Sequence, residues 1–197
     1  MLYGNPMSGK TTAAGGIRDY LHKAGMPAEI ISSAKLRLKG QPHSSTTGFV
    51  DEENARTKKA KDKAYQAMCS AAASCLRKGV VPILDATFHK LYRRKWVYGL
   101  ATDENAGVYI IWLVFNNDKA IKKCLRERRR AGKVSALHTW EQYIVMRQQA
   151  DRLEDNELVK HPDCVAGILQ FDRDTGKIRL YGRMGGFARK MADALTK

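Results

Sequence analysis

The chain has 197 residues, the length of one domain, and its 44% hydrophobic and 28% charged residues exclude wholesale disorder. No apolar run approaches the roughly 20 residues that cross a bilayer, and the N-terminus lacks a signal segment, so we expect a cytoplasmic protein without a membrane partner. Thirty-five Lys and Arg against 20 Asp and Glu leave a net charge of +15, which favours a polyanionic partner. The four cysteines lack zinc-ligand spacing, so we expect free thiols and no structural metal.

Hydrophobic patterns predict strands and helices that alternate along the chain. The predicted strands are residues 1–3, 28–32, 80–84, 108–115, 165–171 and 177–181, the last two as a hairpin closed by a turn at 174–176. The predicted helices are residues 11–24, 51–78, 90–101, 118–130, 139–153 and 186–195, with a polar loop at 33–49. This alternation predicts a parallel sheet covered by helices on both faces.

The most specific motif is a phosphate-binding loop of the form G-x-x-x-x-G-K-[ST], followed at once by an amphipathic helix. Its residues, with the one that follows, are Gly4, Asn5, Pro6, Met7, Ser8, Gly9, Lys10, Thr11 and Thr12. Backbone N–H groups of such a loop form an anion nest, the lysine reaches the β- and γ-phosphates, and the hydroxyl after it binds Mg²⁺. We therefore predict ATP and Mg²⁺ as ligands, with Lys10 catalytic and Thr11 a metal ligand.

The strand before this loop is unusually short, because only Met1, Leu2 and Tyr3 precede Gly4. Either the strand is short in the protein, or the native chain begins a few residues upstream.

A second candidate, Asp85, follows the apolar run 80–84, whose continuous hydrophobicity is typical of a strand covered on both faces. Ligands of doubly wound sheets bind outside the carboxyl ends of the strands, so Asp85 is expected to point toward the phosphate loop. There a carboxylate holds Mg²⁺ or accepts a proton from an attacking hydroxyl. The alternative is that Asp85 or Thr87 merely caps the next helix.

The stretches GNPMSGKTT and LDATFHKLYRR resemble the polynucleotide-kinase-like branch of P-loop kinases. This branch includes seryl-tRNA kinases, tRNA-modification ATPases of the Kti12 type, 5′-hydroxyl polynucleotide kinases and, near them, phage kinases of hydroxymethylated pyrimidines in DNA. The resemblance covers about residues 1–153. It places Asp85, Thr87 and Arg94 at family positions, and it implies an ATP-dependent enzyme acting on, or beside, nucleic acid.

Eight basic residues and one acid, Glu127, lie between Lys119 and Lys133. In P-loop kinases an arginine-bearing lid follows the fourth strand, and its guanidinium neutralises charge on the transferring phosphoryl group. The resemblance implies a lid at roughly 118–153, and Arg126 and Arg130, four residues apart on one helix face, are our candidates. The alternative is a solvated helix face.

The general base for the acceptor hydroxyl is the weakest part of the pattern. Polynucleotide-type kinases often carry an Asp just after the second strand, but residues 32–35 hold no carboxylate. The base is then Asp85, or Asp51 or Glu53, which alternatively suit the dipole of a helix start. Glu53 and Arg56 also resemble a pattern of Kti12-like relatives. Phe88 and His89 are candidates for stacking on an acceptor base.

These features predict an α/β fold: a P-loop NTPase three-layer sandwich with a mostly parallel sheet, an arginine-bearing helical lid and a C-terminal β-hairpin, forming a single domain over residues 1–197. The predicted activity is transfer of the γ-phosphate of ATP to a hydroxyl on DNA or tRNA. Two alternatives stay open: a regulatory ATPase stimulated by nucleic acid, and a small-molecule kinase of the zeta-toxin or antibiotic-phosphotransferase kind.

Overall fold

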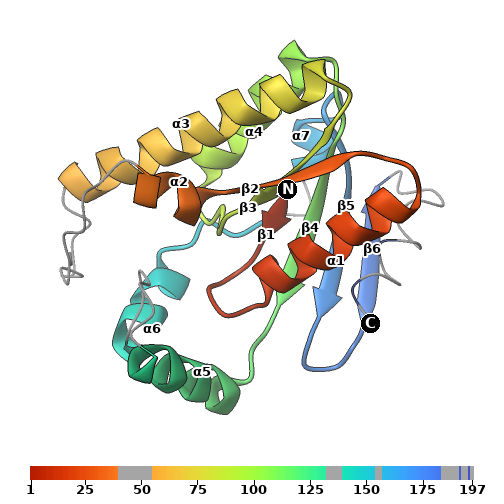
Figure 1. Ribbon diagram of the computed structural model, residues 1–197. Coiled ribbons are helices and arrows are strands. Elements are labelled where there is room, and N and C mark those ends of the chain that lie inside the picture. The colour runs from red at the N-terminus through yellow and green to blue at the C-terminus, as the bar shows by residue number, and fades with distance from the viewer. Residues whose placement is uncertain (40–54, 132–138, 154–156, 183–190, 192–194, 196–197) are drawn as a thin grey trace.

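The computed structural model describes residues 1–39, 55–131, 139–153, 157–182, 191 and 195. One six-stranded sheet forms its centre, in the order β2-β3-β1-β4-β5-β6 (Figure 1). The strands are β1 (Leu2–Tyr3), β2 (Ala28–Ser32), β3 (Val81–Asp85), β4 (Val108–Val114), β5 (Val165–Asp172) and β6 (Ile178–Gly182). All neighbouring pairs are parallel except β5 and β6, which form the predicted antiparallel hairpin.

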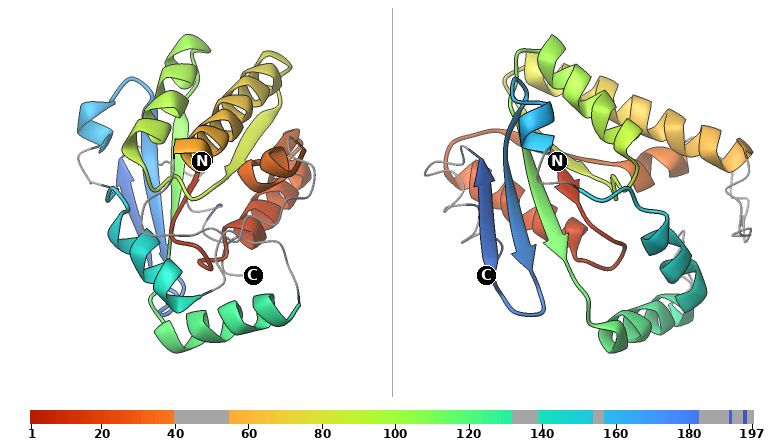
Figure 2. Two further views of the ribbon diagram at one scale, coloured as in Figure 1. Left: turned by 90° about the vertical axis from the view of Figure 1, so that its left-hand side faces the viewer. Right: turned by 180° about the vertical axis from the view of Figure 1, so that it is seen from behind.

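Helices cover both faces of this sheet (Figure 2). The helices are α1 (Lys10–Lys23), α2 (Ser33–Lys39), α3 (Ala55–Arg77), α4 (Leu91–Asp103), α5 (Asp118–Arg130), α6 (Trp140–Gln148) and α7 (Glu157–Lys160). Successive strand residues point to opposite faces. In β3, Leu84 therefore packs with α3 and α4, whereas Ile83 packs with α1. The fold is the predicted three-layer α/β sandwich with a mostly parallel sheet.

The predicted loop at 33–49 is wrong in its first part. Residues Ser33–Lys39 form α2, because Ala34, Lys35 and Leu36 are good helix formers directly after the end of β2. Residues 40–49 lie outside the described part of the chain. The short helix α7 was also missed, since four residues give no measurable periodicity.

The helix predicted at 139–153 begins as expected and ends early. Thr139 accepts a hydrogen bond from the Gln142 amide, and the Gln142 side chain accepts one from the Thr139 amide, so the two residues form a capping box. The helix stops at Gln148, and the residues after it bond instead to the loop between β3 and α4. The helix predicted at 186–195 lies mostly outside the described residues; Met191 and Leu195 are described and helical.

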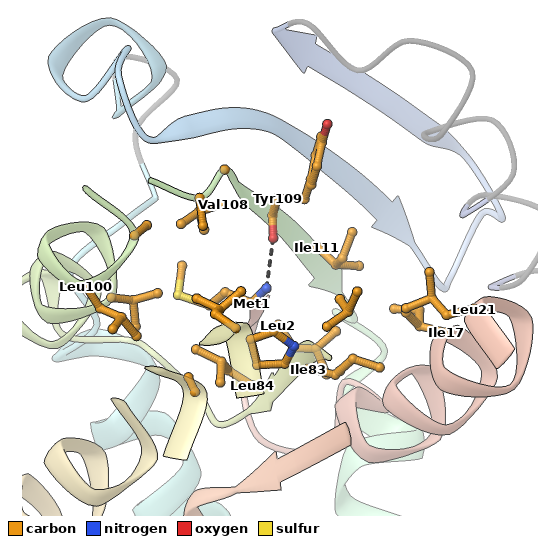
Figure 3. Close-up of a pocket in the computed structure, with 18 of the residues that line it drawn as sticks. Met1, Leu2, Ile17, Leu21, Ile83, Leu84, Leu100, Val108, Tyr109 and Ile111 are labelled. Carbon is orange, nitrogen blue, oxygen red and sulfur yellow. Dashed lines mark hydrogen bonds between the residues drawn. The ribbon is translucent and has the colours of Figure 1, made fainter. Parts of the chain in front are cut away.

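An apolar cavity of about 120 Å³ lies between β3 and β4, at the amino end of β1 (Figure 3). The Met1 amino group points into it and donates a hydrogen bond to the Tyr109 carbonyl oxygen at 2.8 Å. Burial among apolar side chains lowers the pKa of this amine from 8.0 to about 5. Within the described residues, no helix has the length and apolar character required to cross a bilayer.

Candidate active site

The phosphate-binding motif forms the loop between β1 and α1, at the carboxyl end of the sheet (Figure 1). Gly4 has φ +149°, and a side chain there would collide with the Leu113 carbonyl oxygen. Gly9 has φ +86°, and Met7, a non-glycine residue, has φ +68°. This left-handed backbone is costly for Met7, so the loop holds a strained conformation in which amides line a nest.

Lys10, the first residue of α1, folds its side chain back into this loop. Its ammonium donates hydrogen bonds to the carbonyl oxygens of Asn5 at 2.6 Å and Gly4 at 3.0 Å. The residue is 8% exposed, and burial lowers the pKa of the ammonium from 10.5 to about 8. The nearby Asp85 carboxylate opposes this shift, and the charge of Arg128 adds to it. The lysine is therefore a buried cation that loses its proton at a pH just above neutral.

Asp85 is the last residue of β3 and is 8% exposed. Its Oδ2 accepts a hydrogen bond from the Thr11 hydroxyl at 2.9 Å. Parallel pairing produces this contact, because β3 and β1 end together with Leu2 opposite Asp85. A hydroxyl and a carboxylate are the oxygen donors that Mg²⁺ accepts, and such sites keep several waters, so this pair fits the predicted metal. Among the described residues, no group of three or more His, Cys, Asp and Glu side chains is arranged to hold a metal ion.

The loop after Asp85 corrects one expectation. Phe88 is fully buried, packs edge-on against Tyr65 at 5.2 Å, and so has no face for an acceptor base. Its amide also donates to the Tyr65 hydroxyl. Thr87 lies beside the phosphate loop: its carbonyl oxygen is 3.5 Å from the Gly4 amide, and its hydroxyl contacts His89 Nδ1 at 2.9 Å.

Helices α5 and α6 form an arm beside the phosphate loop (Figure 1). Their buried residues Ile121, Leu125, Tyr143 and Met146 form a separate cluster, and Met7 of the phosphate loop packs against it. The strained residue of the loop is thus held by the predicted lid.

The arginines of α5 are all exposed, and they differ in their spacing from its buried residues. Ile121, Leu125 and Arg128 are spaced by four and three residues, so Arg128 lies on the side of the helix that carries the two buried residues. Its charge acts on Lys10. Arg126 and Arg130, the candidates from the sequence, line a surface hollow with Lys123 and Glu127. Arg128 is therefore the stronger structural candidate, and its spacing from Ile121 and Leu125 was the available signal.

Arg94 lies in the protein interior with no exposed surface. It forms an ion pair with Glu157 at 2.6 Å and donates to the carbonyl oxygens of Phe88, Asp151 and Arg152. These bonds connect α4 to the chain that leaves α6. Asp51 and Glu53, the alternative bases, lie outside the described residues, as does the side chain of Arg56.

This fold and loop define the class: an α/β P-loop NTPase, with the architecture of P-loop kinases. The chain matches the AAA_33 family, an AAA domain, over residues 1–153, and it belongs to this family. A comparison with curated proteins finds no significant match.

Solved structures support the fold. Kti12 of Chaetomium thermophilum, in complex with ADP-AlF3, is 18% identical with a TM-score of 0.64, covering 98% of this chain and 95% of that one. APS kinase CysC of Mycobacterium tuberculosis, in complex with AMPPNP and APS, is 14% identical with a TM-score of 0.58, covering 100% and 95%. A sugar kinase from Janibacter sp. HTCC2649 is 15% identical with a TM-score of 0.52, covering 99% and 90%. These similarities show the fold, and none of them identifies a subfamily.

Proposed function

We propose that the protein is an ATP-dependent kinase that transfers the γ-phosphoryl group to a hydroxyl on a nucleic acid. The observation that carries the kinase part is the 2.9 Å bond between Thr11 and Asp85, beside a buried Lys10. This arrangement places three groups together at the carboxyl edge of the sheet: a cation that can bind phosphate, a hydroxyl that can bind a metal ion, and a carboxylate. The structures in complex with ADP-AlF3 and AMPPNP belong to proteins of the same fold, which supports nucleotide binding here.

Each group has a role in this proposal. The free backbone N–H groups of the phosphate-binding loop and the Lys10 ammonium bind the β- and γ-phosphates. Thr11 and Asp85 would hold Mg²⁺, which when bound neutralises phosphate charge. In the transfer, the acceptor oxygen bonds to the γ-phosphorus while the bond to the β–γ bridging oxygen breaks, and ADP leaves. The acceptor proton passes to a carboxylate, for which Asp85 is the described candidate at this edge.

Residues 118–153 act as the lid of a single domain of 197 residues. Closure of α5 places a guanidinium on the transferring phosphoryl group, where fixed positive charge is worth orders of magnitude in rate. From the sequence, Arg126 and Arg130 were the candidates for this role. The side of α5 that carries its buried residues favours Arg128.

The proposal that the acceptor is a nucleic acid rests on the positive charge of the protein. The basic residues of α5 are exposed, and among the described residues the acids of this helix pair with basic side chains: Lys123 with Glu127, and Arg147 of α6 with Asp118. The other basic side chains of α5 are exposed on a chain of net charge +15, and the charge of Arg128 among them acts on Lys10 of the phosphate loop. Exposed positive charge of this kind suits a phosphate backbone. The four cysteines are free thiols, which suits a reducing compartment such as the cytoplasm.

The test follows the label from γ-labelled ATP into separate reactions with tRNA, 5′-hydroxyl DNA, hydroxymethyluracil DNA and a metabolite mixture. Asp85→Asn is expected to bind nucleotide and transfer nothing; full transfer by this variant removes Asp85 from the mechanism. Label on a metabolite, with activity insensitive to salt, contradicts the nucleic-acid acceptor. Phosphate release stimulated by nucleic acid without a labelled product identifies a regulatory ATPase, which the lack of a carboxylate at residues 32–35 favours as the second candidate.

A further inference from the structure

Arg173, which sequence reasoning did not single out, follows β5 and lies against the phosphate-binding loop. Its backbone is fixed: the Arg173 amide donates to the Val114 carbonyl oxygen at 3.0 Å, extending the pairing of β4 with β5. The adjacent carboxylates accept hydrogen bonds from backbone amides, Asp172 within the turn and Asp174 from the segment after β4. Asp172 accepts from the Asp174 amide at 2.9 Å, and Asp174 accepts from the Asn116 amide at 2.6 Å.

The side chain of Arg173 is exposed, and it lies between an aromatic ring and the loop. Its guanidinium carbon lies 4.9 Å from the centre of the Phe115 ring. Nη1 donates to the Met7 carbonyl oxygen at 3.4 Å, a long hydrogen bond. A Cβ placed on Gly9 would lie 2.9 Å from Nη1 and 3.1 Å from the guanidinium carbon. The planar group therefore fills the space beside Gly9 that a larger residue would occupy.

These contacts fall on two residues of the loop with left-handed backbone. Met7 has φ +68° and Gly9 has φ +86°, left-handed conformations of the kind found in backbone nests that bind anions. A strained conformation persists only when its surroundings hold it. On one side Met7 packs against the cluster of α5 and α6; on the other, Arg173 binds its carbonyl oxygen.

We propose that Arg173 is a positioning residue, which holds the phosphate-binding loop in its anion-binding conformation through the planar contact with Gly9, Met7 and Phe115. Its effect on nucleotide affinity rests on the function proposed above; its effect on the loop itself does not. One face of the guanidinium lies toward Phe115, and the group is in close contact with Gly9. The guanidinium therefore acts through the loop rather than as a surface on which a base stacks.

The first test needs no nucleotide. Hydrogen exchange of a peptide covering residues 4–12 is measured in the wild type, Arg173→Ala, Arg173→Lys and Arg179→Ala. Arg179 is the matched control, because it is an exposed arginine on the same hairpin and its loss changes the net charge equally. We expect faster exchange of the loop in Arg173→Ala, partial recovery in Arg173→Lys and no change in Arg179→Ala. Unchanged exchange in Arg173→Ala overturns the proposal.

The second test is calorimetric titration with a non-hydrolysable ATP analogue and Mg²⁺ at low and high salt. We expect Arg173→Ala to weaken binding about tenfold, or ~1.4 kcal/mol, at both salt concentrations. Full rescue by Arg173→Lys, with a loss that disappears at high salt, means that only charge matters and contradicts the positioning role. If the wild type binds no analogue, the proposed function fails, while loop exchange still decides the role of Arg173.

Discussion

Nucleotide affinity should fall as pH rises through the pKa of Lys10. Burial lowers this pKa to about 8 in the free protein, and phosphate binding requires the charged form. At pH 7 about 90% of free molecules carry the charge, and at pH 9 only about 10%. Above pH 8, binding must therefore take up a proton. The dissociation constant rises about tenfold between pH 7 and pH 9, which is ~1.4 kcal/mol.

The assay is calorimetry with Mg²⁺ and an ATP analogue at pH 7, 8 and 9, repeated in two buffers of different ionisation enthalpy to count protons. Uptake of about 0.5 proton is expected at pH 8 and about 0.9 at pH 9. Lys10→Met, titrated at higher concentration, reports the pH dependence of the nucleotide alone and should be flat over this range. Affinity independent of pH in the wild type, with no proton uptake, would refute the assignment of Lys10 as a buried, phosphate-binding cation.

Two further outcomes are expected. Arg128→Ala should lower kcat for transfer by about 100-fold while Arg126→Ala changes it less than threefold; equal losses in steady-state rates would contradict the assignment by helix face. Arg94→Ala leaves Glu157 buried without its partner, so urea denaturation should show a loss of about 3–5 kcal/mol, and a loss under 1 kcal/mol would argue against a buried ion pair.

Much of the fold could be predicted because its signals are local. The continuous apolar run at 80–84 indicated a strand covered on both faces, and β3 is such a strand. Asn117 and Thr139 cap α5 and α6 through their own side chains, at or just before the predicted helix starts at residues 118 and 139. Where tertiary contacts decide, prediction failed: α6 ends at Gln148 because the residues after it bond to another loop.

The residues of the candidate site also divide into those that could be predicted from the sequence and those that depend on tertiary contacts. The bond between Thr11 and Asp85 joins residues 74 apart in sequence, but both follow parallel strands, and parallel strands end at one edge. The choice of Arg128 depends on which face of α5 packs inward. A run of basic residues does not by itself indicate that face. Arg173 depends on the pairing of β5 with β4, for which the sequence around it carries no motif.

Arg94 shows how a position that the resemblance singled out acquires its physical meaning from the structure. The resemblance placed it nine residues after Asp85, and the structure places it in a network of buried hydrogen bonds. Its guanidinium binds the carbonyl oxygens of Phe88, in the loop after β3, and of Asp151, in the chain that leaves α6. The Asp151 amide in turn donates to the His89 carbonyl oxygen at 2.7 Å. The chain that leaves α6 and the loop that follows Asp85 are therefore one bonded unit. In the proposed lid closure, a movement of α6 would act directly on the segment that positions the carboxylate.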